Sequence, residues 1–309
     1  MEVTNPLTYA VPFFLTFIVI EIVLSLKHEK HLYYWNDLFA SISMGGGAAI
    51  LAIFTKAATF ALFWATFELF KPLRMAWFGY ESFGYAWYVW IICQFLDDHN
   101  YYWHHRLSHT VRVLWAAHVV HHSSEYFNFG SGIRNGWFTL FYKPLSWMWL
   151  AVIGFEPLMI VTCLGIQAVY QFQLHTQSVP HLGFLEKFMN TPRQHQVHHS
   201  CNYEYLDKNH GGFLNIFDRL YGTFHQYDEK IEPKFGVLHP PESYNPFVIA
   251  FHEFKEIAKD VKKSKNLKHS FMYIFGPPGW SPDGSTKTAR QIQRELFEKM
   301  DKQSEAQLA

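Results

Sequence analysis

The sequence predicts an all-α fold, a multi-pass integral membrane helical bundle with a cytoplasmic helical cap. Three observations predict it. Apolar runs of membrane-spanning length fill most of the chain up to about residue 175. Aromatic residues make up 19% of the composition, which is typical of lipid-facing surfaces and interfacial belts. Histidines recur three or four residues apart, the spacing that places side chains on one face of a helix.

The first predicted span is the apolar run 6–26, which only Glu21 interrupts. At about 1.5 Å per residue it is long enough to cross a bilayer. It is a span rather than a signal peptide, because its start is acidic and no small-residue cleavage site follows. Residues 38–70 are also apolar and contain three consecutive glycines and Lys56. We expect one span followed by a second helix at the interface, with a tight hairpin of two spans as the alternative.

The next predicted span is 84–103, which leads into the first histidine pair. Residues 138–174, divided at Pro157, predict a membrane hairpin whose return brings His175 back to the side from which the hairpin left. A soluble all-α protein with buried helices is the alternative. It is disfavoured because these runs exceed the about 10 to 14 residues of a buried core helix.

Charge placement predicts the orientation in the membrane. Lys27 and Lys30 follow the first span and further lysines fill the C-terminal region, so the positive-inside rule places both in the cytoplasm. Counting the predicted spans then puts every histidine cluster on the cytoplasmic face. We therefore expect a multi-pass protein of a bacterial inner membrane or of the endoplasmic reticulum.

Beyond His199 the chain is polar and rich in turn residues. Residues 207–212 predict a loop, 246–265 an amphipathic surface helix, 276–280 a rigid turn and 288–303 a charged helix. We expect this tail to be a solvated appendage. The 26 basic residues balance 26 acidic ones and form no polybasic patch, so nucleic acid is not an expected partner.

Twelve of the 19 histidines fall between His99 and His199. Eight of them form three clusters in helical register, at His105/His109, His118/His121/His122 and His195/His198/His199. Because eight imidazoles exceed the four ligands of a tetrahedral zinc site, they indicate two metal ions. Neutral imidazole suits iron, zinc, copper or nickel. The three cysteines form no C-x-x-C pair, which argues against iron–sulfur, structural zinc and disulfide scaffolds.

These clusters, in this order, resemble the fatty acid hydroxylase and sterol desaturase superfamily of membrane non-heme di-iron oxygenases. The resemblance covers 98–224 in detail. Within the superfamily, the alkylglycerol monooxygenase branch is the most similar, over the segments Tyr-Tyr-Trp-His-His-Arg at 101–106, His-His-Ser-Ser-Glu at 121–125, Asn-Thr-Pro at 190–192 and Asp-Lys-Asn at 207–209. The resemblance implies that His175 is a ninth metal ligand. His181 and His210 depart from the branch, which usually has Asn and Tyr there.

The resemblance also implies a chemistry. It implies two iron ions, with zinc as a substitute, O2, and an external reductant, which is a tetrahydropterin in the alkylglycerol branch. The implied reaction is hydroxylation of a lipid C–H bond leading to ether-lipid cleavage, with fatty-acyl or membrane-lipid hydroxylation and sterol desaturation as alternatives. The expected partners are the lipid substrate, the bilayer and an electron donor that the sequence does not identify. A rival from another class is a membrane metal-binding or transport protein, and one-sided clustering of the histidines argues against it. A zinc hydrolase would need fewer imidazoles.

Three acidic residues are candidates to support the histidines from the second coordination shell. Asp98 lies seven residues before His105, on nearly the same helix face, where its carboxylate could accept the second imidazole N–H. Its alternative roles are a helix cap or an ion pair with Arg106. Glu125 follows the second cluster and is either such an acceptor, a ligand or an ordinary exposed loop residue. Asp207, like Asp218, follows the third cluster and either orients a histidine or pairs with an arginine, Arg134 or Arg193.

These expectations divide the chain into three regions. Residues 1–97 form the N-terminal membrane helices and 98–228 form the histidine-rich catalytic region, which includes the hairpin at 138–174. Residues 229–309 form the cytoplasmic C-terminal tail.

Overall fold

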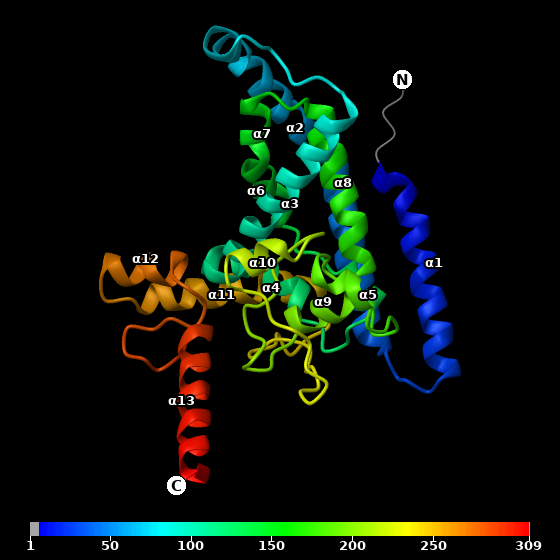
Figure 1. The fold of residues 1–309 in the computed structure, drawn as a ribbon. Helices are drawn as coiled ribbons and strands as arrows, with labels where there is room; N and C mark the ends of the chain where they lie inside the picture. The colour runs from blue at the N-terminus through cyan, green and yellow to red at the C-terminus, as the bar shows by residue number, and fades with distance from the viewer. Residues whose placement is uncertain (1–5, 309) are drawn as a thin grey trace.

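The computed structural model describes residues 6–308, and within them it contains helices and two isolated β-bridges but no strand. The all-α prediction is confirmed. Figure 1 shows an upright bundle with a helix standing alongside it. The bundle contains α2 (Trp35–Phe78), α3 (Trp87–Thr110), α6 (Thr139–Tyr142), the 3-10 helix η1 (Lys143–Trp147), α7 (Met148–Ile153) and α8 (Pro157–Gln173), and the helix alongside is α1 (Pro6–Lys27).

The remaining helices gather at the lower end of the bundle (Figure 1). They are α4 (Arg112–His122), α5 (Phe129–Gly132), η2 (Gly183–Lys187), α9 (Pro192–His198) and α10 (Ile216–Leu220). Two further helices, α11 (Pro246–Lys263) and α12 (Leu267–Phe275), lie across the bundle axis at this level, and α13 (Ala289–Leu308) projects away from the bundle.

The second apolar run departs from its prediction. Residues 38–70 lie within one 44-residue helix, so both the hairpin and the division into two helices are wrong. The glycine triplet is a packing surface rather than a turn. A Cβ at Gly45 would lie 2.7 Å from the carbonyl oxygen of Ile133, and one at Gly47 would lie 2.7 Å from the Trp137 indole nitrogen. The absence of side chains therefore lets the segment after α5 lie directly against α2.

Two helices of the described residues, α1 and α2, are long and apolar enough to cross a membrane. At about 1.5 Å per residue, α2 is about twice as long as the hydrocarbon core is thick. It therefore extends beyond any bilayer that it crosses. The crossings expected for α3 and for the 138–174 hairpin are not tested by this observation and stay predictions.

The hairpin is partly correct. Its turn lies where expected, with Gly154 at a positive φ of 110° and Pro157 in the first turn of α8. Its second arm is the single helix α8. Its first arm is broken into α6, η1 and α7, because Pro144 lies in the first turn of η1 and lacks the N–H that a continuous helix needs.

Glu21 connects α1 to the rest of the fold. It is 2% exposed, and its carboxylate accepts hydrogen bonds from the Tyr33 hydroxyl at 2.5 Å, from the backbone N–H of Phe129 at 2.8 Å and from the Thr176 hydroxyl. Because Thr176 directly follows His175, Glu21 ties the outer helix to the histidine-bearing region.

The expectation that the C-terminal region is a solvated appendage is wrong for α11 and α12, which pack against α4, whereas α13 projects away from the bundle. The predicted amphipathic helix is α11, and its Ile249 and Ala250 are buried against α4 and α2. Arg112 of α4 also donates to Glu253 at 2.8 Å and to Asp260 at 2.7 Å. These contacts fix α11 to the helix that carries the second histidine cluster. The helix α12 was not predicted at all.

Candidate metal centre

The nine histidines singled out from the sequence lie close together at the lower end of the bundle. They form two groups whose nitrogen atoms lie within 4.8 Å of one another inside each group. The five-histidine group contains His105, His109, His118, His122 and His198, and the four-histidine group contains His121, His175, His195 and His199. Each group combines residues from distant parts of the chain, so the fold itself assembles both.

Local helix geometry sets the positions within each cluster. His105 and His109 lie one turn apart near the end of α3, and the second cluster fills the last turns of α4. The third cluster ends α9, a short helix that Thr191 caps by accepting a hydrogen bond from the Gln194 N–H. This cap starts the helix where it can direct its histidines inward.

Four rings are oriented by backbone carbonyls. The Nδ1 atoms hydrogen-bond to carbonyl oxygens of other residues, in the pairs His105–His210 at 2.9 Å, His121–Arg134 at 3.0 Å, His175–Gln171 at 2.8 Å and His198–Lys208 at 2.8 Å. A carbonyl oxygen can only accept, so Nδ1 carries the proton in each of these rings. In a neutral imidazole the Nε2 atom is then a bare acceptor.

The Nε2 atoms of the four-histidine group face one another. His175 Nε2 lies 3.1 Å from His121 Nε2, 3.1 Å from His195 Nε2 and 3.2 Å from His199 Nε2. In the other group, the buried Nε2 atoms of His109 and His198 have no hydrogen-bond partner among the described residues. Converging imidazole nitrogens, among them the unprotonated Nε2 atoms of His121 and His175, fit a bound cation, and an all-imidazole donor set suits iron or zinc.

Burial keeps these imidazoles in the neutral form that binds metal. Loss of hydration lowers the pKa of His121 from 6.5 to about 4 and lowers the pKa of His122, His195 and His199 well below 6.5. The neighbouring histidines add to this effect, since a second positive charge nearby is unfavourable. At neutral pH the two groups therefore present lone pairs rather than positive charges.

The three acidic candidates take different places. Asp207 faces the site, with its Oδ1 atom 3.4 Å from His109 Nδ1. Glu125 is exposed and belongs to neither group, so its predicted role as an acceptor or a ligand is wrong. The alternative, an exposed loop residue, is correct.

Asp98 is buried but does not bond to a histidine, so that prediction is wrong as well. Its two carboxylate oxygens accept hydrogen bonds from the backbone N–H groups of Phe213 at 2.6 Å and Leu214 at 2.9 Å. Neither Arg106 nor a helix end is its partner. Asp218 holds the same loop from the other side by accepting from the N–H groups of His210 and Gly211, both at 2.7 Å. Because His210 supplies the carbonyl that orients His105, the two carboxylates act on the site through this loop.

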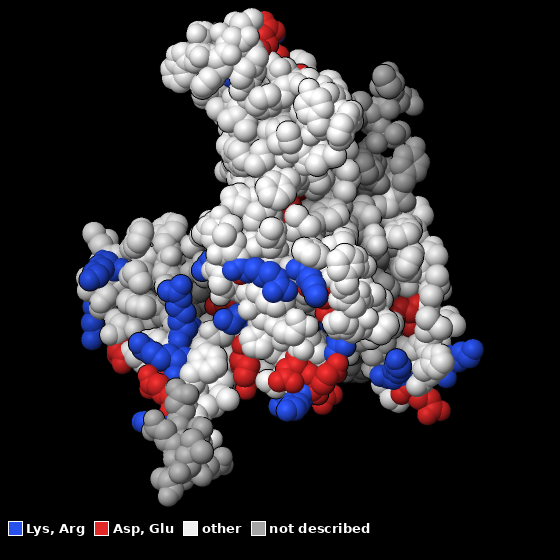
Figure 2. All heavy atoms as spheres, in the orientation of Figure 1, with Lys and Arg blue, Asp and Glu red and all other residues white. Residues whose placement is uncertain are grey.

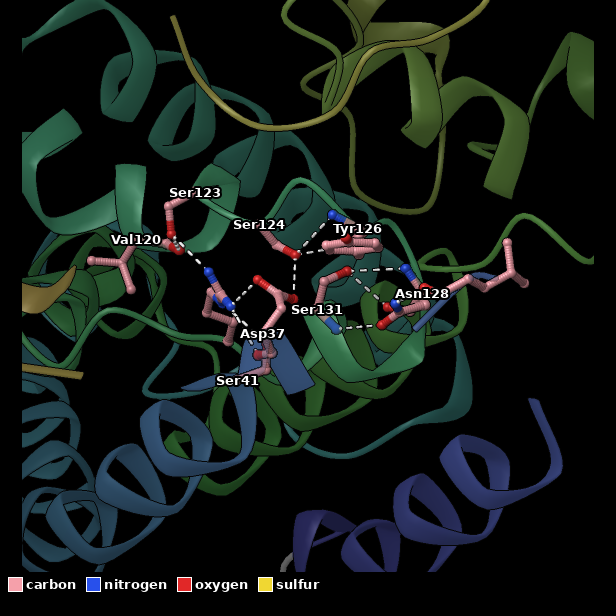
Figure 3. A network of polar contacts seen from close by, with 10 residues as sticks. Asp37, Ser41, Val120, Ser123, Ser124, Tyr126, Asn128 and Ser131 are labelled. Atoms are coloured by element: carbon pink, nitrogen blue, oxygen red, sulfur yellow. Dashed lines mark hydrogen bonds and ion pairs between the residues drawn. The ribbon is translucent and has the colours of Figure 1, made fainter. Parts of the chain in front are cut away.

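The sequence did not predict a buried ion pair that is linked to the four-histidine group through His121. The Arg134 guanidinium donates to the Asp37 carboxylate at 2.5 Å, to the Ser41 hydroxyl at 3.0 Å and to the Ser123 hydroxyl at 3.1 Å. Figure 3 shows Asp37 and Ser41 on α2 and Ser123 after α4 converging on this network. The backbone carbonyl of Arg134 accepts from His121, so the ion pair fixes the residue that orients a site histidine. Thus Arg134 pairs with neither Asp207 nor Asp218, and Arg193 pairs with Glu229.

His210 was expected only as a departure from the alkylglycerol monooxygenase branch, and its place beside the metal centre was not predicted. It is 1% exposed, its ring lies 5.0 Å from that of His109, and its Nε2 atom hydrogen-bonds to the Asp207 carbonyl at 3.1 Å. His181 is instead partly exposed and lies 3.1 Å from Glu186, away from both groups.

The known proteins that are similar to this chain are lipid hydroxylases and monooxygenases. Residues 90–223 match the fatty acid hydroxylase family. Alkylglycerol monooxygenase of Homo sapiens is 31% identical over 293 residues, which cover 91% of this chain and 61% of that protein. The Danio rerio enzyme of the same name is 31% identical over 290 residues, with the same coverage. Ornithine lipid hydroxylase OlsE of Rhizobium tropici is 32% identical over 132 residues, which cover 42% of this chain and 40% of that protein.

The chain thus spans 61% of the length of the first two relatives. No solved structure gives a significant match.

Proposed function

We propose that the chain, whose residues 90–223 match the fatty acid hydroxylase family, is a membrane-bound di-iron oxygenase that hydroxylates a lipid C–H bond. The observation that carries the proposal is the pair of histidine groups whose nitrogens converge. Nine histidines are the proposed ligands: His105, His109, His118, His122 and His198 for one ion, and His121, His175, His195 and His199 for the other.

Two iron ions bound there would supply the activation of O2 for C–H hydroxylation, with zinc able to occupy the same ligands. The protein's own residues orient and shield the site. The Nδ1–H donors to backbone carbonyls fix the rings, and Asp207 supports His109. Phe127 lies over the four-histidine group, its ring 5.5 Å from that of His175 and 5.2 Å from that of His199. Trp115 lies 5.0 Å from His109. These aromatic rings exclude water from the nitrogens.

An alkylglycerol is the proposed substrate, because two relatives named alkylglycerol monooxygenase align with 91% of this chain. Hydroxylation of the carbon next to the ether oxygen would use one atom of O2, while a tetrahydropterin supplies the two electrons that reduce the other atom to water. The product is a hemiacetal, which breaks down to a fatty aldehyde and glycerol. A second candidate is hydroxylation of a membrane lipid, which the similarity to ornithine lipid hydroxylase favours.

The proposed placement is a multi-pass protein with the histidine groups on the cytoplasmic side of a bacterial inner membrane or the endoplasmic reticulum. On the face shown in Figure 2, charged side chains gather in the lower half and at the top of the bundle, with almost none on the column between them. Such a column suits hydrocarbon. The regions 1–97, 98–228 and 229–309 would then be membrane helices, catalytic region and cytoplasmic tail.

The test is an assay of anaerobically purified, iron-loaded protein in lipid nanodiscs with O2 and a tetrahydropterin. We expect fatty aldehyde from an alkylglycerol, no such product from the matched monoacylglycerol, and loss of product in His198→Ala and His121→Ala. The control His239→Ala changes an exposed histidine outside both groups and should be fully active. Turnover of ornithine lipid alone would favour the second candidate. Absence of any O2-dependent lipid product would contradict both.

A further inference from the structure

The helix α12 presents an uncovered apolar face. Leu267, Phe271 and Phe275 are four residues apart and therefore lie on one side of the helix, where they are 89%, 59% and 49% exposed. The neighbouring α11 adds Phe247 and Phe251. We call these five residues the apolar ledge. The Phe247 and Phe251 rings also contact Trp137 and Phe138, whereas the three α12 side chains follow one another along one helix face. Single exposed apolar residues are ordinary, but such a row along a helix marks an interaction surface.

The ledge lies at a particular height in the molecule. Figure 1 shows α11 and α12 lying across the axis of the upright bundle, at the level where the bundle meets the lower part, with α12 at the left and slightly above α11 in this view. Figure 2 shows that this level is also the boundary between the uncharged column and the charged lower half. A bilayer around the column would therefore have its surface at the ledge.

The charges around the ledge favour an anionic surface. Six exposed lysines lie on α11, on α12 and between them: Lys255, Lys259, Lys262, Lys263, Lys265 and Lys268. The acidic residues of α11 are already paired, since Glu253 and Asp260 bind Arg112 and Glu256 binds Lys259. Helices that combine aromatic residues with lysines beside them lie in the membrane interface and are attracted to anionic lipids, because the long lysine side chains can extend to the headgroups. Here Lys255 lies one turn after Phe251, and Lys268 lies between Leu267 and Phe271.

We propose that α12 and the first turns of α11 lie on the membrane surface beside the histidine groups, with the apolar ledge at the acyl boundary and the lysines among anionic headgroups. This proposal rests on the membrane placement given under the proposed function. It has a consequence for the site, because Ile249 and Ala250 of α11 pack against Val120 of α4, between His118 and His121. The ledge thus sets the height of the metal centre relative to the lipid headgroups.

The test uses single spin labels in proteoliposomes of phosphatidylcholine and phosphatidylglycerol, after replacement of the three native cysteines by alanine. Phe271→Cys reports on the ledge. Ile53→Cys, 71% exposed on α2, is the hydrocarbon control, and Glu298→Cys, exposed on α13, is the aqueous control. Relaxation enhancement is measured with O2, which concentrates in lipid, and with a water-soluble nickel complex. Size-exclusion chromatography checks that each labelled variant is folded and monodisperse.

We expect the Phe271 label to be enhanced several-fold more by O2 than by nickel, as at Ile53, and the Glu298 label to show the reverse. A Phe271 label that behaves like Glu298, while Ile53 stays in lipid, would overturn the ledge proposal and leave the membrane placement standing. A nickel-accessible Ile53 would overturn both. A Phe271 label shielded from both reagents and broadened by a neighbouring label would identify a second copy as the occupant, against the proposal.

Discussion

The Nε2 atoms of His121 and His175 lie 3.1 Å apart, and neither carries a proton, because both rings donate Nδ1–H to a backbone carbonyl. Two bare acceptors at this distance cannot form a hydrogen bond with each other. A cation between them removes the repulsion and uses both lone pairs. This pair comes from α4 and from the residue two positions after α8, so the chain fold, rather than one motif, creates the geometry.

Asp207 should support metal binding through His109, and the exposed Glu125 offers a matched control. Asp207→Asn keeps a residue that tolerates the positive φ of 53° at this position but removes the charge beside His109. We expect the metal affinity of the five-histidine group to fall about 10- to 100-fold. The exposed Glu125→Gln control should leave it unchanged. Competition with a chelator measures both, and equal affinities in the two variants would contradict the role of Asp207.

The Asp37–Arg134 ion pair should support the four-histidine group selectively. Asp37→Asn leaves a buried guanidinium without its countercharge, which costs about 3 to 5 kcal/mol of stability. The substitution also releases the Arg134 carbonyl that orients His121. The metal ion of the four-histidine group should therefore dissociate at a lower chelator concentration than in the unsubstituted protein, while the other ion stays bound. Glu81→Gln breaks the exposed Lys71–Glu81 pair as a control and should leave stability and metal binding nearly unchanged, because solvent screens this pair. Equal weakening of both metals by Asp37→Asn would indicate general unfolding instead.

Gly212 should be needed for the orientation of His105. A Cβ at this position would overlap the Gln167 amide and the Asp98 carboxylate, so Gly212→Ala must displace the loop whose His210 carbonyl orients His105. We expect weaker metal binding by the five-histidine group. Gly46→Ala is the control, because its Cβ meets nothing within 4 Å, and it should be neutral or stabilise α2 by about 1 kcal/mol. The prediction fails if the two variants retain metal equally.

The metal-free protein should lose stability in mild acid. The pKa of His121 is about 4 in the folded protein and 6.5 when unfolded, so the unfolded state binds more protons between these values. This makes stability fall as the pH falls from about 6.5 to 4, and the other buried histidines act in the same direction. Asp218, whose pKa burial raises to about 6, acts in the opposite direction, but the buried histidines outnumber the buried carboxylates of this kind. Thermal unfolding of apo protein at pH 7.0 and 5.0 measures this. A melting temperature that is equal or higher at pH 5.0 would contradict the buried, neutral state of the histidines.

Features that depend on neighbouring residues could be predicted from the sequence, whereas features that depend on long-range contacts could not. The three histidine clusters and the starts of α8 and α11 follow from spacing and from Pro157 and Pro246, which act within a few residues. Asp98 shows the limit. Helix geometry places it on the face of His105, but two backbone N–H groups of a loop more than one hundred residues later take its carboxylate. The partner of Arg134 lies 97 residues away on α2, and no local pattern indicates that pairing.

The glycine triplet shows a second limit. Three consecutive glycines favour a turn by composition, yet here they remain helical because Ile133 and Trp137 pack closely against α2. Only the tertiary contact decides between these outcomes. The missed α12 is similar, since its nine residues are too few for a strong periodic signal and its position depends on packing against α11 and α4.

The most direct test of the central claim is the anomalous difference density of crystals of the anaerobically purified, iron-loaded protein, collected on both sides of the iron absorption edge. The account predicts two iron peaks per chain, one among the nitrogens of His121, His175, His195 and His199 and one among those of His105, His109, His118, His122 and His198. A single peak, or iron bound outside the two histidine groups, would contradict it.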